Sequence, residues 1–368
     1  MKKPLIIIAP DKFKGTLSSL KAATTIKNAL SECGVEAIMK IIEMADGGEG
    51  SAKLLSGDNH RRVFYDAQDC GGRKIRAAVW VDQTTDTAYI DSAEVIGMKR
   101  RSNLSIPVER RTSYTLGILL KQLVEKYSKV GLAVGGTATV DGGAGMMQAL
   151  GATFTLNGTI CDREILISDF SESNVECDWS GVNINQLRRK LTVYVDVDVP
   201  LIASPEHPSS LMFAKQKGVT AINVLMNELQ RYSALLPEGT HNGAGGGLAS
   251  ALGAMGIQIK SGAETLCARI ESLVAIQRPA LIITGEGSID AQSFEGKVVG
   301  TLYEICAKHR IPMLAIGGIC NKALKPRQGI KIVATINKPL KSISAAQAAD
   351  NLKIATVRAF REMNSLKF

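Results

Sequence analysis

The sequence predicts an α/β protein of two domains, one built on a doubly wound parallel sheet and one on a mixed sheet. Length and composition predict this fold class. The chain has 368 residues, whereas single hydrophobic cores stop growing near roughly 250 to 300 residues. Aliphatic residues and glycine are frequent but only 5% of residues are aromatic, which is typical of short buried strands joined by glycine turns.

The N-terminal segment begins with the alternation that a parallel sheet requires. Residues 5–9 form an apolar run that ends at Pro10 and predicts a buried strand. Apolar residues then recur at helical spacing over residues 20–33 until Gly34 ends the helix, and residues 35–44 predict the next strand. Strands that alternate with helices indicate parallel pairing with right-handed crossovers.

The alternation then breaks. Three predicted strands at 63–65, 77–81 and 87–90 are separated by short polar turns, a pattern that indicates an antiparallel meander from a different domain. The alternation of strands and helices resumes with a helix that begins near residue 112 and with a strand at 130–134.

The rest of the chain has a mixed part and a regular part. Residues 151–277 give mixed signals, among them a capping box at Ser261 and Glu264 that opens a helix. The last third alternates cleanly and ends in a long helix. The predicted strands are 191–197, 280–284, 313–316 and 332–336, and the predicted helices are 221–235, the one from 261, and 344–363.

These elements predict two discontinuous domains. The doubly wound domain takes residues 1–56, 112–150 and 278–368, and the second domain takes residues 57–111 and 151–277. The second domain is therefore threaded between segments of the first.

Three loops that combine glycines with a carboxylate follow predicted strands. They span residues 45–50, 135–145 and 284–290. Ligands bind beyond the carboxyl ends of parallel strands, so these loops can converge. Glycine amides cradle anions and carboxylates hold metal ions, which favours phosphate chemistry. The alternative is that Asp46, Asp141 and Asp290 each cap a helix or close a turn.

Several classes of protein are excluded by what the sequence lacks. No P-loop spacing occurs, and the glycines at 243–247 do not follow a strand as a dinucleotide-binding turn would. The seven cysteines are scattered, which indicates neither a disulfide framework nor a zinc ribbon and favours a cytoplasmic protein. The net charge of +9 is spread along the chain without interleaved aromatics, so a nucleic-acid partner is not expected, and no apolar run is long enough for a membrane span.

Five segments together resemble the bacterial type I glycerate kinases, in matching order and over essentially the whole length. They are residues 8–15, 45–50, 135–151, 243–256 and 283–297. The resemblance implies a flavodoxin-like domain and a restriction-endonuclease-like domain, with the active site in the cleft between them. It also implies transfer of the γ-phosphate of ATP to D-glycerate, most often at the 2-hydroxyl, with Mg²⁺ as the metal ion.

The resemblance also implies roles for individual residues. It marks Asp196, Asp290 and Lys14 as catalytic candidates, and Asp11, Lys14 and Lys217 as substrate-binding candidates. The metal candidates are Asp141, Glu286 and Asp290. The candidates for binding ATP are Asp46, Gly47, Gly48, Gly136, Gly142, Gly143, Gly285, Glu286, Gly287 and Lys297.

The sequence departs from the family pattern at Val140, Val195, Val199 and Ser288, where polar or charged residues are usual. Three alternatives therefore stay open: phosphorylation of the 3-hydroxyl, a kinase of a related hydroxy acid, and a non-catalytic sensor of nucleotide or sugar acid. The expected partners are small molecules, and the chain is expected to be a monomer or a homodimer.

Overall fold

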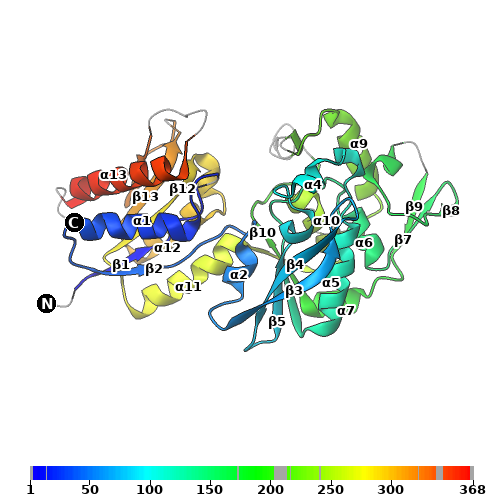
Figure 1. Ribbon diagram of the computed structural model, residues 1–368, viewed down its shortest axis with the longest axis horizontal. Coiled ribbons are helices and arrows are strands. Elements are labelled where there is room, and N and C mark those ends of the chain that lie inside the picture. The colour runs from blue at the N-terminus through cyan, green and yellow to red at the C-terminus, as the bar shows by residue number, and fades with distance from the viewer. Residues whose placement is uncertain are drawn as a thin grey trace. The chain divides into compact units, whose positions relative to one another are not determined.

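The computed structural model divides into two compact units, Met1–Asp46 with Ala263–Phe368, and Gly47–Gly262 (Figure 1). It describes residues 3–13, 15–171, 174–202, 214–215, 217–239, 242–321, 323–336 and 343–364. We call Met1–Asp46 with Ala263–Phe368 the first unit and Gly47–Gly262 the second unit, and we describe each by itself.

The first unit is built on a five-stranded parallel sheet with the order β14-β13-β12-β1-β2. Numbered within the unit and read from β2, this order is the flavodoxin-like 2-1-3-4-5. The strands are β1 (Leu5–Ile8), β2 (Ile38–Ile41), β12 (Leu281–Ile289), β13 (Met313–Cys320) and β14 (Ile330–Ala334). The prediction of a doubly wound parallel sheet is confirmed.

Helices complete the first unit. Helices α1 (Ser19–Glu32) and α13 (Ala345–Asn364) lie side by side, as Figure 1 shows. Ser18 caps α1 by accepting a hydrogen bond from the Lys21 amide, and the apolar sides of α1 and α13 bury alternate residues of the sheet, such as Ile6 and Ile8. The other helices are α11 (Gly262–Ile276), η4 (Ala291–Phe294) and α12 (Val298–His309).

The second unit is built on a mixed six-stranded sheet with the order β11-β10-β6-β5-β4-β3. The pairs β3–β4 and β4–β5 are antiparallel, and the remaining pairs are parallel. The strands are β3 (His60–Gln68), β4 (Lys74–Asp82), β5 (Thr87–Asp91), β6 (Lys129–Ala133), β10 (Leu191–Val195) and β11 (Gln258–Ser261). This confirms the predicted meander and the mixed sheet.

A smaller antiparallel sheet and short helices surround this sheet. The smaller sheet contains β7 (Thr153–Leu156), β8 (Thr159–Ile160) and β9 (Val175–Asp178). The longer helices are α5 (Tyr114–Lys126), α7 (Ile184–Lys190), α9 (Ile222–Ser233) and α10 (Leu248–Ala254). The shorter ones are α2 (Ser51–Leu55), α3 (Ala93–Ile96), α4 (Arg101–Leu104), η1 (Val108–Arg110), α6 (Ala144–Ala149), η2 (Ile167–Phe170) and η3 (Ala244–Gly246).

The domain boundaries differ from the predicted ones. Residues 112–150 were expected in the doubly wound domain, but β6 pairs with β5 and β10 in the mixed sheet, so this segment belongs to the second unit. The first unit likewise ends at Asp46 and resumes at Ala263. A buried parallel strand has the same apolar pattern in either sheet, so periodicity alone could not assign it.

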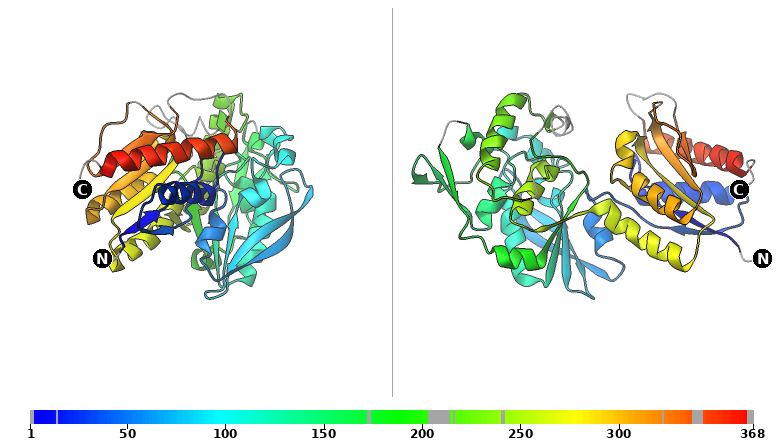
Figure 2. Two further views of the ribbon diagram at one scale, coloured as in Figure 1. Left: turned by 60° about the vertical axis from the view of Figure 1, so that its left-hand side comes forward. Right: turned by 180° about the vertical axis from the view of Figure 1, so that it is seen from behind.

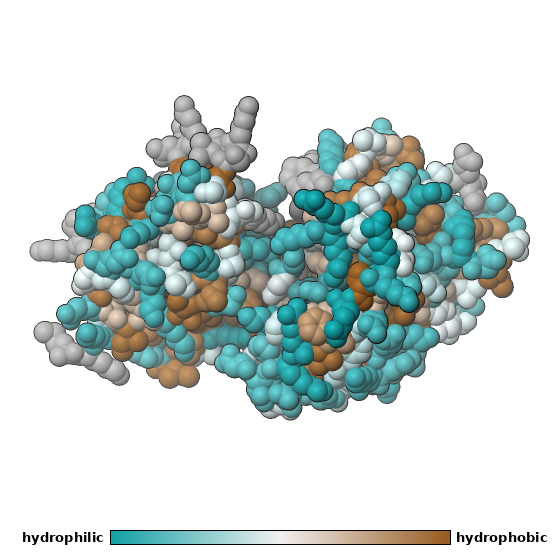
Figure 3. Space-filling view, in the orientation of Figure 1, coloured by the Kyte–Doolittle hydropathy of each residue, from teal (hydrophilic) through white to brown (hydrophobic). Residues whose placement is uncertain are grey.

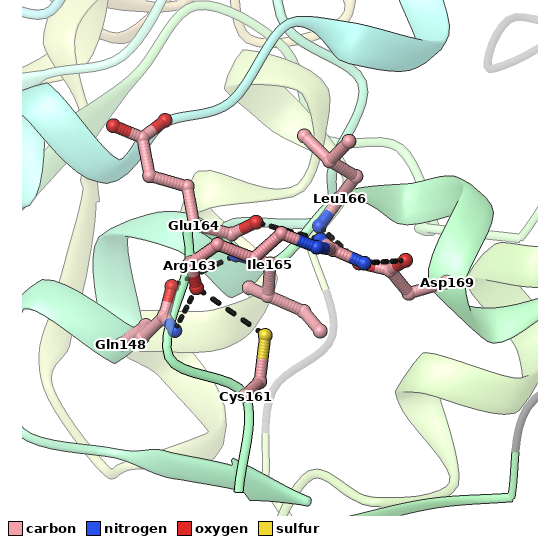
Figure 4. A network of polar contacts seen from close by, with 7 residues as sticks. All are labelled: Gln148, Cys161, Arg163, Glu164, Ile165, Leu166 and Asp169. Carbon is pink, nitrogen blue, oxygen red and sulfur yellow. Dashed lines mark hydrogen bonds and ion pairs between the residues drawn. The ribbon is translucent and has the colours of Figure 1, made fainter. Parts of the chain in front are cut away.

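Gln148 at the end of α6 anchors the loop that precedes η2 (Figure 4). Its side-chain amide donates to the Arg163 carbonyl at 2.8 Å and accepts from the Ile165 amide at 2.9 Å. Arg163 forms a bidentate pair with Asp169, whose carboxylate also accepts from the Leu166 amide. The loop is therefore fastened to α6 by one side chain and to η2 by an ion pair.

We predict that Gln148→Ala lowers the free energy of unfolding by about 1 to 2 kcal/mol, because it leaves the Ile165 amide without its partner and removes one of the two donors to the Arg163 carbonyl. Denaturant unfolding measures this. The control is Gln122→Ala on the exposed side of α5, expected to change stability by less than about 0.5 kcal/mol. Equal effects of the two substitutions would contradict the anchoring role.

Candidate active site

The first unit brings acidic residues together at the switch point of its sheet. The order 2-1-3-4-5 reverses between β1 and β12, and open α/β sheets bind ligands at this place. Asp11 follows β1, and its amide donates to the Gly285 carbonyl of β12 at 2.8 Å. Glu286 is the next residue of β12. Backbone pairing between strands far apart in the sequence thus sets these two carboxylates close together.

Asp46, after β2, completes this group, which we call the carboxylate cluster: Asp11, Asp46 and Glu286. Asp11 and Asp46 are buried, and Lys12 donates to Asp46 at 3.1 Å. Burial raises the pKa of Asp11 to about 7; the charge of Asp46 acts in the same direction, and the charge of Lys12 opposes both. Burial is also the main cause that raises the pKa of Glu286. The three carboxylates therefore lie where a further cation would stabilise their charged forms.

Glu286 is the residue whose contacts fit a metal ion best. Its Oε1 atom is buried and has no hydrogen-bond partner among the described residues. Among these residues no three His, Cys, Asp or Glu side chains form a ready metal cage. Mg²⁺ is usually bound by one or two carboxylates, with water and substrate phosphates as the other ligands. An orphaned carboxylate oxygen beside further carboxylates fits that requirement.

Two other predicted residues of the last loop lie near helix starts. Asp290 caps η4: its carboxylate accepts from the Ser293 amide at 3.3 Å, and its own amide donates to the Ser293 hydroxyl at 3.0 Å. This is the capping alternative considered for Asp290. Lys297 occupies the N-cap position of α12, and its charge acts to lower the pKa of Glu286. A helix N-terminus with a lysine beside it suits a phosphate group.

The predicted glycines of this loop have a packing role. A Cβ atom on Gly285 would lie 2.2 Å from the Ile316 carbonyl oxygen of β13. On the neighbouring strand, a Cβ atom on Gly318 would lie 2.5 Å from the carbonyl oxygen of Gly287. These glycines thus let β12 and β13 approach each other closely.

The second unit contains a separate group of predicted residues around Asp196, which follows β10. A Cβ on Gly47 would lie 2.3 Å from the Val195 carbonyl oxygen. A Cβ on Gly135 would lie 2.5 Å from both the Asp196 carboxylate and Gly48. The loops after β6 and β10 and the segment at Gly47 therefore meet around a half-buried carboxylate. Gly136 is next to Gly135 and adopts a positive φ of 80°.

Asp141 has the contacts of a structural residue. It is fully buried, and its carboxylate accepts hydrogen bonds from the Ser113 amide and hydroxyl and from the Gly143 and Gly145 amides. Three of these hydrogen bonds go to Oδ2, and the one from the Gly143 amide goes to Oδ1. Asp141 therefore organises the turn before α6, and its role as a metal ligand stays a prediction.

The predicted anion-binding amides of Gly142 and Gly143 are also used within the protein. The Gly142 amide donates to the Gly246 carbonyl at 3.0 Å, and the Gly143 amide donates to Asp141. The glycine turn at 243–247 packs so tightly on this loop that a Cβ on Gly246 would lie 2.1 Å from the Thr139 carbonyl oxygen. Both amide protons are thus used within the protein, and the binding of ATP by these two glycines stays a prediction.

Lys217 is buried beneath the same loop. Its ammonium donates to the Thr139 carbonyl at 2.7 Å and to the Thr137 hydroxyl at 3.1 Å. Burial lowers its pKa to about 8, although the charges of Asp141 and Asp196 act in the opposite direction. The predicted substrate-binding lysine is therefore a buried cation close to Asp196.

Sequence reasoning missed three residues of these groups. Lys12 is one, since the resemblance points instead to Lys14, which lies outside the described residues. Arg111 is buried and donates to the carbonyls of Ala138 and Lys217. Asp91, at the end of β5, accepts from the Gly50 and Ala52 amides and so caps α2. Of these three residues, only Asp91 could have been found from the sequence, because it is a polar residue at the end of an apolar strand.

Two of the valines that depart from the family pattern belong to the core. Val140 is 4% exposed and Val195 is 7% exposed, and both are members of the large apolar cluster of the second unit. Their side chains therefore pack inside the unit.

Comparisons with known proteins agree on one family. The chain matches the glycerate kinase family over residues 6–364. It is 31% identical over 339 residues to glycerate 2-kinase of Escherichia coli (strain K12), and the matched region covers 85% of this chain and 84% of that protein. It is 31% identical over 330 residues to glycerate kinase of Bacillus subtilis (strain 168), with 85% and 84% covered. A solved structure described as "putative glycerate kinase 2 from Salmonella typhimurium LT2" superposes with a TM-score of 0.75 at 26% identity, covering 99% of both chains.

We predict that Gly246→Ala destabilises the protein by about 2 kcal/mol more than Gly57→Ala does, because overpacking a tight contact is costly. Both glycines have a positive φ, near 71° and 75°, but an added Cβ on Gly57 meets no atom within 4 Å. Thermal and denaturant unfolding measure the difference. Equal destabilisation would show that backbone strain alone, and not the approach to Thr139, limits the turn.

We also predict that wild type gains stability relative to Lys217→Met as the pH rises from about 8 to 10.5. In this window the unfolded chain keeps the proton that folded Lys217 has released, so the free energy of unfolding increases with pH. Below pH 8 Lys217 is protonated in both the folded and the unfolded chain. The difference in free energy of unfolding between wild type and Lys217→Met should therefore be constant there. Urea unfolding at several pH values tests this, and a difference independent of pH up to 10.5 would contradict a depressed pKa.

Proposed function

Because the chain belongs to the glycerate kinase family and is a kinase, we propose that it transfers the γ-phosphate of ATP to the 2-hydroxyl of D-glycerate. The products are 2-phosphoglycerate and ADP. The observation that carries the phosphate chemistry is the carboxylate cluster at the switch point of the first unit, with the orphaned Oε1 of Glu286. Phosphoryl transfer depends mainly on positioning and on charge stabilisation, which such a cluster supplies.

In this proposal Glu286 holds Mg²⁺, with Asp11 and Asp290 as the neighbouring acidic groups. When bound, the ion neutralises charge on the transferred phosphate. The raised pKa of Glu286 agrees with a group that is buried and short of positive charge. Lys297, at the start of the 12-residue helix α12, stabilises phosphate oxygens together with the amides of the helix start.

Asp196 is the proposed acceptor of the hydroxyl proton. It is half-buried, follows β10, and lies against the glycines at 47–48 and 135. Lys217 places a positive charge near it, which suits the carboxylate of an acidic substrate. Asp290 is the second candidate for this role, but its carboxylate already caps η4.

A coupled assay of ADP release with D-glycerate tests the activity, and phosphorus NMR of the product tests the position. Glycerate-dependent ADP release with a 2-phosphoglycerate signal supports the proposal. A 3-phosphoglycerate signal would overturn the position, faster turnover of another hydroxy acid would overturn the substrate, and saturable binding without turnover would indicate a sensor.

We predict that Glu286→Gln lowers kcat by about 100-fold or more, because it removes a charge that acts on the transferred phosphate. Its melting temperature should stay close to that of wild type, since burial already disfavours the charged form of Glu286. The matched control is Glu295→Gln, an exposed residue of the same segment, for which kcat should not change.

Steady-state kinetics and thermal unfolding of the two variants decide between a catalytic and a structural role. If Glu286→Gln lost activity only in proportion to folded protein, or kept wild-type kcat, Glu286 would not serve the reaction.

A further inference from the structure

Strand β3 forms one edge of the six-stranded sheet in the second unit. It is nine residues long, and among the strands that the structure describes it pairs only with β4. Figure 2 shows the β3–β4 hairpin at the border of its sheet. A long edge strand offers unpaired backbone donors and acceptors, so proteins either guard it or use it for association.

The register with β4 identifies which backbone groups point outward. The Asp69 amide donates to the Arg73 carbonyl and the Gln83 amide donates to the Asn59 carbonyl, at the two ends of the hairpin. In an antiparallel ladder, bonded pairs alternate with pairs whose amides and carbonyls point away. The odd-numbered residues of β3 therefore bond to β4, and the even-numbered residues from His60 to Gln68 direct their backbone groups to the outer edge.

The side chains of these even-numbered residues share one face of the strand. Phe64 lies in the middle and is 43% exposed. Arg62 and Arg76 lie over its ring at 4.6 and 4.8 Å from the centroid. Asp66 lies on the other side of Phe64 along the strand. Figure 3 shows mainly hydrophilic residues over this part of the unit, with hydrophobic residues among them.

We propose that two copies of this chain associate by antiparallel pairing of their β3 strands, with the two-fold axis at Phe64. In this register Phe64 faces Phe64, and Arg62 of each copy faces Asp66 of the other. Every outward amide and carbonyl of the even-numbered residues then finds a partner, because even residues meet even residues. The pairing is isologous, as expected for a two-fold dimer.

The charges disfavour two of the alternative registers. Moving the axis to Arg62 sets Arg62 against Arg62, and moving it to Asp66 sets Asp66 against Asp66. Like charges directly opposite destabilise a pair, whereas opposite charges and aromatic pairs each contribute roughly 0.2 to 1 kcal/mol. Charged residues on an edge usually prevent pairing. Here Arg62 and Asp66 are placed symmetrically about Phe64, so a second copy in the proposed register sets opposite charges against each other.

A hollow next to the edge extends the proposed interface. It has a volume of about 500 Å³ and lies between the end of the hairpin and α5, with Ala67, Ile75 and Ile118 in its lining. Ile118 is 41% exposed. In the proposed register Arg61 of the second copy faces Ala67, so its aliphatic stem covers part of this apolar surface.

Charge exchange between two variants tests the proposal. In Arg62→Asp the introduced carboxylate faces Asp66 of the other copy, and in Asp66→Arg the introduced guanidinium faces Arg62. Each variant alone is therefore expected to be monomeric in analytical ultracentrifugation, whereas wild type is expected to be a dimer. An equimolar mixture of the two variants sets opposite charges against each other at both positions and is expected to give a heterodimer.

A cross-link provides a second test that does not depend on those variants folding well. Residues facing each other in a bonded antiparallel pair have Cα atoms about 5.5 Å apart, within the range of a disulfide. Oxidised Phe64→Cys should therefore form a covalent dimer. Wild type and Arg61→Cys, whose side chain lies on the other face, should not. A monomeric wild type, variants that stay dimeric, a mixture without heterodimer, or no preference for Phe64→Cys would each overturn the proposal.

Discussion

The parallel pairing of β1 with β12 is the interaction on which the proposed chemistry depends. It joins segments far apart in the chain, as the bond from the Thr284 hydroxyl to the Ala9 carbonyl shows across 275 positions. The same pairing carries the Asp11 amide to the Gly285 carbonyl and so fixes Asp11 beside Glu286. Backbone hydrogen bonds therefore keep these two residues close together. A cation bound between them would stabilise their charged forms, which makes the switch point suitable for a metal and phosphate group.

The second unit depends on a different constraint, the close approach of glycine backbones. The loop at 135–145, the turn at 243–247 and the segment at Gly47 touch at distances that leave no room for side chains. Asp141 uses both carboxylate oxygens to hold one of these loops, and Lys217 is buried under it. Glycines that suggest a phosphate cradle in the sequence thus also allow backbone to pack on backbone. Asp196 and Lys217 are charged groups of this unit that we assign to the substrate.

Much of the fold followed from the sequence, because periodicity reports burial directly. The aliphatic run at residues 5–8 and the long helix at 345–364 were predicted within a few residues. The placement of 129–133 was not, since a buried parallel strand looks the same in either sheet. The resemblance marked Glu286, Asp196 and Lys217 as site residues, and these assignments stay predictions, because the sequence could not separate ligand-facing groups from structural ones. Asp141 and Asp290 have the same glycine-rich setting as Glu286, and only hydrogen-bond partners distinguish them.

In the proposed reaction, Glu286 couples the metal ion to the nucleotide phosphates. Titration calorimetry of ADP binding with and without Mg²⁺, on wild type and on Glu286→Gln, tests it most directly, because the double difference isolates the coupling. We expect Mg²⁺ to strengthen ADP binding to wild type by a factor that largely disappears in Glu286→Gln, while ADP binding without metal stays similar in the two proteins. An equal strengthening by Mg²⁺ in both proteins would contradict it.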